Sequence, residues 1–206
     1  MNPQFWWFLT RASGIVAWLM LTASVIWGIV LSTKAFPESR RPAWLLDLHR
    51  WLGGLTVSFV AIHLVALVAD SYVQFDLVDL MVPFAAAWKP LAVALGVVAM
   101  WLLVAVEATS LAMRRLPRRI WRWIHLSSYA VFLLASLHAA FAGTDRSTWL
   151  YQVTAVASIV AVVWATVYRL THRRPPPGAR RALAASMPAQ PLPSPTRQPT
   201  AQHQES

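Results

Sequence analysis

Four histidines lie inside long apolar stretches of the sequence, and their spacing arranges them as two pairs. His49 and His63 are 14 residues apart in one stretch, and His125 and His138 are 13 residues apart in another. At a rise of 1.5 Å per residue these separations amount to about 21 Å and about 19.5 Å along a helix axis. Two helices that run in the same direction would therefore bring His49 beside His125 and His63 beside His138.

Paired imidazoles at two depths are typical of ligands to porphyrin iron. A haem iron can take two axial ligands from opposite faces, and neutral imidazole tolerates burial once its second nitrogen has a hydrogen-bond partner. A zinc or non-haem iron centre would need its protein ligands gathered around one point. The spacing therefore predicts two bis-histidine haem sites, one near each side of a bilayer, with all four histidines as iron ligands.

Two other interpretations use the histidines without a haem. Intramembrane histidines also form proton paths in small transporters or channel subunits, and they bridge helices in purely structural subunits. Both alternatives predict a colourless protein, so an absorption spectrum separates them from the haem hypothesis.

The elements that must position these histidines are membrane-spanning helices. The chain has 206 residues, of which 57% are apolar and 13% charged, whereas soluble domains have about 25% charged residues. About 20 apolar residues are needed to cross a bilayer as a helix. The five candidate spans are 12–32, 45–69, 84–108, 120–142 and 149–170. Since their connections are short and unpaired backbone is not tolerated in lipid, we expect an all-α integral membrane bundle within residues 1–172.

The positive charges lie beside the spans, which favours lipid contact and topology over nucleic-acid binding despite a net charge of +10. They follow the first, third and fifth spans: Lys34, Arg40 and Arg41; Arg114, Arg115, Arg118 and Arg119; Arg169, Arg173 and Arg174. The positive-inside rule predicts a bacterial-type plasma membrane protein with its N-terminus outside and its C-terminus in the cytoplasm. Residues 173–206 are predicted to form a disordered, Pro- and Arg-rich cytoplasmic tail.

Several other residues are candidates for contact with a haem. Arg122 near His125, and Arg11 near the opposite end of the bundle, could hold haem carboxylates through charge-assisted hydrogen bonds. Gly53 and Gly54 follow His49 by one turn. They would allow close approach either of a flat macrocycle or of a neighbouring helix.

The 13-residue spacing conflicts with a regular helix over 120–142. On an ideal helix, residues 14 apart lie within about 40° of one another, but residues 13 apart lie about 140° apart. His125 and His138 would then face different sides. Either this helix is locally distorted, or the two haems approach it from different directions.

With the histidines placed, the chain resembles the ferric-reductase-like transmembrane superfamily, which includes NADPH oxidases, ferric reductases and the haem subunits of bacterial periplasmic methionine sulfoxide reductase systems. Three stretches carry the resemblance: LHRWLGG at 48–54 leading to His63, ATSLAMRRL at 108–116, and RRIWRWIHLSSY at 118–129 leading to His138. The spacing of the four histidines matches that family's haem signature. The resemblance covers about residues 10–172.

The resemblance implies two b-type haems and electron transfer from the cytoplasmic side to an extracytoplasmic redox acceptor. It also implies that the chain is a cytochrome b component of an oxidoreductase. This sequence has neither the FAD nor the NADPH domain of the oxidases, and it has five spans where many relatives have six. We therefore expect a stand-alone membrane subunit that receives electrons from a separate flavoprotein or from quinol.

Overall fold

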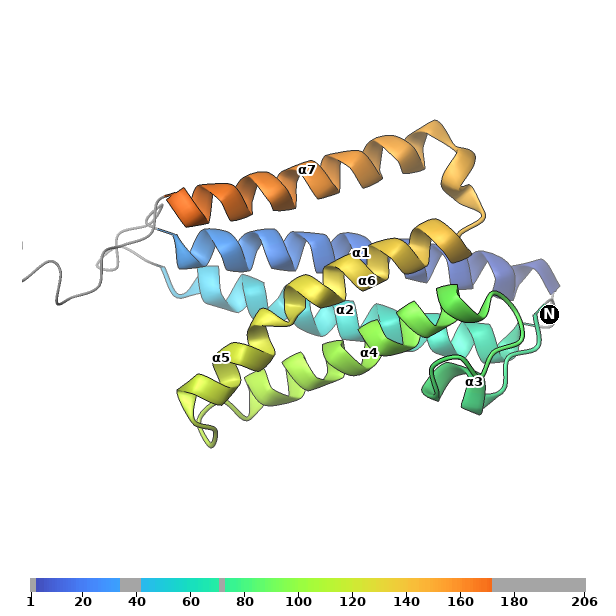
Figure 1. Ribbon diagram of the computed structural model, residues 1–206, viewed down its shortest axis with the longest axis horizontal. Coiled ribbons are helices and arrows are strands. Elements are labelled where there is room, and N and C mark those ends of the chain that lie inside the picture. The colour runs from blue at the N-terminus through green and yellow to red at the C-terminus, as the bar shows by residue number, and fades with distance from the viewer. Residues whose placement is uncertain (1–2, 34–41, 71–72, 172–206) are drawn as a thin grey trace, which may run out of the picture. The chain divides into compact units, whose positions relative to one another are not determined.

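The computed structural model describes residues 3–33, 42–70 and 73–171, and their regular structure is helical. The elements are α1 (Pro3–Ser32), α2 (Trp44–Ala69), α3 (Leu77–Met81), α4 (Pro90–Leu111), α5 (Arg118–Leu126), α6 (Ser128–Ala142), the short 3-10 turn η2 (Asp145–Ser147) and α7 (Trp149–Thr171) (Figure 1). Five segments are long and apolar enough to cross a membrane, with α5 and α6 together forming the fourth. The predicted all-α membrane bundle is confirmed. The first basic connection and the predicted tail lie outside the described residues.

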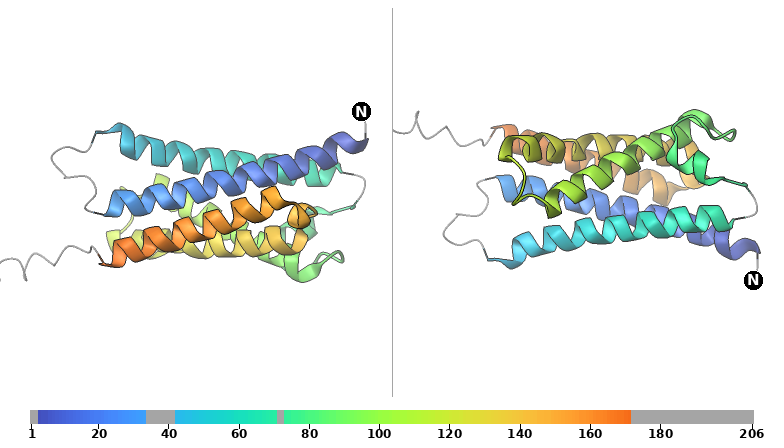
Figure 2. Two further views of the ribbon diagram at one scale, coloured as in Figure 1. Left: turned by 90° about the horizontal axis from the view of Figure 1, so that it is seen from above. Right: turned by 90° about the horizontal axis from the view of Figure 1, so that it is seen from below.

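Two helix pairs build the bundle. The largest contacts join α1 to α2 and α4 to α6, while α7 packs on α1 (Figures 1 and 2). In Figure 1, α2 and the α5–α6 segment run in the same direction, as the pairing of histidines at two depths requires. The histidine-bearing helices α2 and α6 therefore each pack against a helix, α1 or α4, that carries no histidine.

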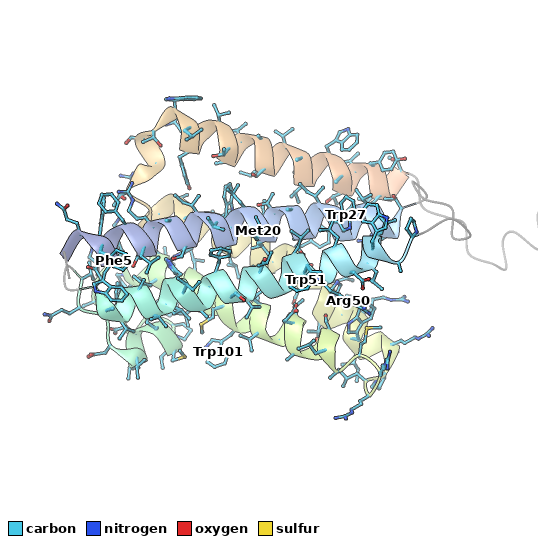
Figure 3. The ribbon with its side chains drawn as sticks, turned by 180° about the vertical axis from the view of Figure 1, so that it is seen from behind. Phe5, Met20, Trp27, Arg50, Trp51 and Trp101 are labelled. Atoms are coloured by element: carbon cyan, nitrogen blue, oxygen red, sulfur yellow. The ribbon has the colours of Figure 1, made fainter. Side chains whose placement is uncertain are left out.

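The core is apolar, and so is much of the outer surface. The residues of the central buried cluster come from α1, α4, α6 and α7: Leu21, Val25, Ile29, Leu103, Val131, Phe132, Val162 and Ala165. Large side chains such as Trp51 and Trp164 are 71% and 66% exposed. Figure 3 shows Phe5 toward one end of the bundle and Trp51 toward the other. An exposed apolar surface of this kind is what a helix bundle presents to lipid.

The fourth predicted span is broken between its two histidines. Ser127 separates α5 from α6, its N–H donates to the Ile124 carbonyl at 3.0 Å, and its hydroxyl donates to the same oxygen at 2.6 Å. A bond to the residue three positions earlier tightens a helical turn, and a serine that bonds back to the main chain bends helices. The bend between α5 and α6 is visible in Figure 1. Of the two explanations for the 13-residue spacing, local distortion is confirmed.

The third span begins later than predicted. Residues 84–89 are not helical, because Phe84 and Lys89 have left-handed backbone conformations with φ of 67° and 42°, and α4 starts at Pro90. The preceding segment instead folds back, with Phe75 and Leu80 packed in one cluster with Val93. The short helix α3 in this segment was not predicted. The first helix, in contrast, begins earlier than predicted, at Pro3 and not at residue 12.

Candidate metal centre

The structure brings the four histidines together as two pairs, each joining α2 to the α5–α6 segment. The ring centroids of His49 and His125 are 5.9 Å apart, and those of His63 and His138 are 6.5 Å apart. The ring planes cross at 77° and 86°. The pairing is the one expected from two helices running in the same direction.

Helix α1 supports both histidines of α2. The Nδ1 atom of His63 lies 2.8 Å from the Thr10 carbonyl oxygen, and the Nδ1 atom of His49 lies 3.4 Å from the Ser24 hydroxyl. Thr10 and Ser24 are 14 residues apart, like the two histidines. Helix α1, which runs antiparallel to α2, thus provides a hydrogen-bond partner for the Nδ1 atom of each α2 histidine.

Helix α4 supports the other two histidines. The Nδ1 atom of His138 lies 2.7 Å from the Ala92 carbonyl oxygen, and the Nδ1 atom of His125 lies 3.3 Å from the Ser110 hydroxyl oxygen. Ser110 donates its single hydroxyl proton to the Val106 carbonyl at 2.7 Å. Its oxygen is therefore left to accept a hydrogen bond from His125.

These partners fix which ring nitrogen carries the proton. The acceptors at His63, His138 and His125 have no proton to give, so Nδ1 is the donor in all three rings. The Nε2 lone pair of each of these three rings is then left for a metal. A hydrogen bond from the second imidazole nitrogen is the usual device that orients a ligating histidine.

Glycines lie behind three of the four rings. A Cβ atom would come within 3.0 Å of the His63 ring at Gly14, 3.1 Å of the His49 ring at Gly28, and 2.7 Å of the His138 ring at Gly96. Helices α1 and α4 thus let the imidazoles pack directly on their backbones. In each case the glycine lies four residues after the Nδ1 partner: Thr10 and Gly14, Ser24 and Gly28, Ala92 and Gly96.

Sequence reasoning selected two other glycines and missed these three. At Gly53 a Cβ would meet the Glu107 carboxylate at 3.0 Å, and at Gly54 it would meet nothing within 4 Å. Gly53 thus permits close contact between α2 and α4, which was one of its two predicted roles. A signal was present in the sequence, because Gly14 and Gly28 repeat the 14-residue spacing of His49 and His63.

Two unpaired polar atoms lie beside the histidine pairs. Among the described residues, the buried side-chain atoms without a hydrogen-bond partner are Thr10 Oγ1 and Trp121 Nε1. Thr10 contacts His63 through its carbonyl, and the Trp121 ring stacks on His125 with centroids 5.0 Å apart. Each pair therefore has one adjacent O–H or N–H donor available for an acidic group, which fits a cofactor that carries carboxylates.

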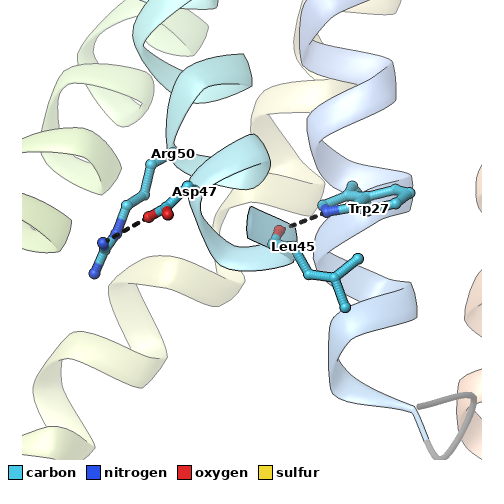
Figure 4. A network of polar contacts seen from close by, with 4 residues as sticks. All are labelled: Trp27, Leu45, Asp47 and Arg50. Atoms are coloured by element: carbon cyan, nitrogen blue, oxygen red, sulfur yellow. Dashed lines mark hydrogen bonds and ion pairs between the residues drawn. The ribbon is translucent and has the colours of Figure 1, made fainter. Parts of the chain in front are cut away.

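Of the two predicted arginines, one is exposed and the other lies against a tryptophan ring. Arg122 is exposed on α5, and Arg11 places its guanidinium carbon 4.0 Å from the centre of the Trp7 ring. Arg50 pairs with Asp47 at 3.2 Å (Figure 4). In that view the pair lies on the side of α2 opposite Trp27, whose indole N–H donates to the Leu45 carbonyl at 2.8 Å.

The histidines come in pairs and not in larger clusters. Within the part of the chain that the structure describes, no group of three or more His, Cys, Asp or Glu residues is placed to hold a metal ion. A two-ligand site requires a metal whose remaining positions are filled by something other than protein, as a porphyrin does for iron.

Comparison with known families identifies the family of the chain. Residues 13–136, more than half of the chain, match the family described as ferric reductase like transmembrane component. The chain belongs to this family. The matched part of this ferric reductase-like protein contains His49, His63 and His125, and His138 follows two residues after its end. No curated protein and no solved structure matches the chain.

Proposed function

We propose that this ferric reductase-like protein is a transmembrane electron carrier that binds two b-type haems, one at each histidine pair. The observation that carries the proposal is the pairing itself: two imidazoles from different helices at each of two depths, each with a hydrogen-bond partner at Nδ1. A haem, when bound, supplies an iron that accepts and releases one electron.

The spacing of the rings supports bis-histidine ligation. Two imidazoles that bind one metal through ring nitrogens, at about 2 Å each, place their ring centroids roughly 6 Å apart. The two pairs, at 5.9 Å and 6.5 Å, bracket that separation.

The groups around each pair supply contacts for haem carboxylates. At the His49–His125 pair the donors are the Trp121 indole N–H and Arg122, which precedes His125 by three residues on α5. At the His63–His138 pair the donors are the Thr10 hydroxyl and the neighbouring Arg11. Charged and neutral donors of this kind bind carboxylates through short hydrogen bonds.

The direction of transfer follows from the proposed orientation. We place the N-terminus outside a bacterial-type plasma membrane and the C-terminus in the cytoplasm, because the arginine-rich ends of the spans belong on the cytoplasmic side. The His49–His125 pair then faces the cytoplasm, where a separate flavoprotein or quinol is the electron donor. The His63–His138 pair faces the extracytoplasmic redox acceptor.

An absorption spectrum and a haem assay of the purified full-length protein test the proposal. We expect low-spin b-type bands and about two haems per chain, in line with one iron per histidine pair. His63→Ala or His138→Ala should remove one haem, and His49→Ala or His125→Ala the other. Haem content that is unaffected by all four substitutions would contradict the assignment, and a colourless protein would favour the proton-path interpretation.

A further inference from the structure

The two histidine pairs differ in the groups that contact their Nδ1 atoms. At the His63–His138 pair both acceptors are main-chain carbonyls, at 2.8 Å and 2.7 Å. At the His49–His125 pair both partners are the hydroxyls of serines, Ser24 and Ser110, at 3.4 Å and 3.3 Å, and Ser110 is an acceptor because its own proton goes to the Val106 carbonyl. Both rings of one pair therefore have main-chain carbonyl partners, and both rings of the other pair have serine hydroxyl partners.

This difference changes how strongly the imidazoles donate electrons to a metal. A short hydrogen bond from Nδ1–H to a carbonyl raises the basicity of the ligating nitrogen, and such bonds are one of the levers that set a haem's potential. The serine bonds are longer than the usual range of about 2.7–3.2 Å and are correspondingly weaker. A carbonyl within a helix is also fixed, whereas a serine hydroxyl can be removed or changed by mutation.

We propose that Ser24 and Ser110 are positioning residues that tune the reduction potential of the haem at the His49–His125 pair. Each hydroxyl accepts the Nδ1 proton of its histidine, stabilises the oxidised iron through the more basic ring, and so lowers the potential of that haem alone. This inference rests on the proposed function. The inference adds to that function by assigning control of one haem's reduction potential to two residues on α1 and α4, the helices that carry none of the four histidines.

The contacts of Ser110 support an accepting role in particular. Because its proton is committed to Val106, its oxygen faces His125 only with lone pairs. Replacing Ser110 with alanine removes the acceptor and leaves the His125 Nδ1–H without this partner. The adjacent Thr109 offers a matched control, since its hydroxyl donates only to carbonyls of its own helix, those of Ala105 and Val106.

The experiment is a redox titration of the full-length haem-loaded protein, combined with electron paramagnetic resonance of the ferric state. Ser24→Ala and Ser110→Ala should each raise the midpoint potential of one of the two haem components. A tenfold change in the preference for ferric over ferrous iron corresponds to about 59 mV for one electron, and a shift of this order is the expected result. Ser24→Thr and Ser110→Thr, which keep a hydroxyl, should stay near the wild-type potential.

Two variants serve as negative controls, and a third assigns each midpoint potential to one histidine pair. Thr109→Ala on α4 and Ser58→Ala on α2, where the Ser58 hydroxyl donates to the Gly54 carbonyl at 2.9 Å, should leave both potentials unchanged. His138→Ala removes the haem of the other pair and identifies the component that remains.

Two different failures can be told apart. A protein without haem would contradict the proposed function. Two bis-histidine haems whose potentials and resonance signals do not move in the alanine variants would overturn the tuning role alone. A shift confined to the His63–His138 component, or a threonine variant that behaves like the alanine variant, would also overturn it.

Discussion

Gly96 provides the sharpest test of how this protein orients its ligands. A Cβ atom at position 96 would lie 2.7 Å from His138 Nδ1, whereas ordinary contacts begin at 3.4 Å. In Gly96→Ala the imidazole must therefore retreat by about 0.7 Å, which exceeds the roughly 0.5 Å tolerance of a functional site. The same movement disturbs the 2.7 Å bond to the Ala92 carbonyl, since such bonds keep their strength only up to about 3.2 Å.

The expected result is selective loss of one cofactor. Disturbing an outer-shell partner of a metal ligand typically weakens metal binding about 10–100-fold, so haem content should fall from about two per chain toward about one. Alanine is a better helix former than glycine by up to about 1 kcal/mol. The helix itself is therefore not weakened, and a loss of haem reports on the His138 ring.

The assay compares haem content and absorption spectra of Gly96→Ala with those of Gly54→Ala. A Cβ atom added at position 54 would meet no protein atom within 4 Å, and so neither ring of the His63–His138 pair; the control should therefore keep the haem of that pair. If Gly96→Ala retained two haems with the wild-type spectrum and potentials, the reasoning from close packing would be refuted, even though His138 could still be a ligand.

Three further substitutions follow from other contacts. Gly14→Ala should weaken the same haem through His63, with a smaller effect because the contact is 3.0 Å and not 2.7 Å; haem titration of the apoprotein measures the difference. Trp121→Phe removes an unpaired buried N–H, and this should stabilise the haem-free protein by about 1–3 kcal/mol. The same change should weaken haem binding. Melting temperatures measured with and without haem should therefore shift in opposite directions. Trp18→Phe removes the 3.0 Å bond that joins α1 to Ser136 on α6 and should cost about 1 kcal/mol in detergent unfolding, while an unchanged unfolding curve would show that this bond contributes nothing.

The sequence by itself determined the number of spans and the identity of the paired residues. A bilayer imposes one length and one composition on every crossing helix, so five apolar stretches could be recognised without knowledge of their packing. Histidine is costly in such stretches, and the matched separations of His49 from His63 and of His125 from His138 therefore indicated the pairing.

Only the tertiary structure decided how the rings are held. The break at Ser127 depends on hydrogen bonds within one turn, which the apolar pattern of the span does not encode. The late start of α4 depends on the left-handed backbone at Phe84 and Lys89, which the apolar pattern does not predict. The supporting role of α1 and α4 depends on which faces of neighbouring helices meet, and this is why Gly96 and its counterparts on α1 were overlooked. Spacing along one helix is a local property, but the atoms behind a side chain belong to another helix and appear only when the two pack together.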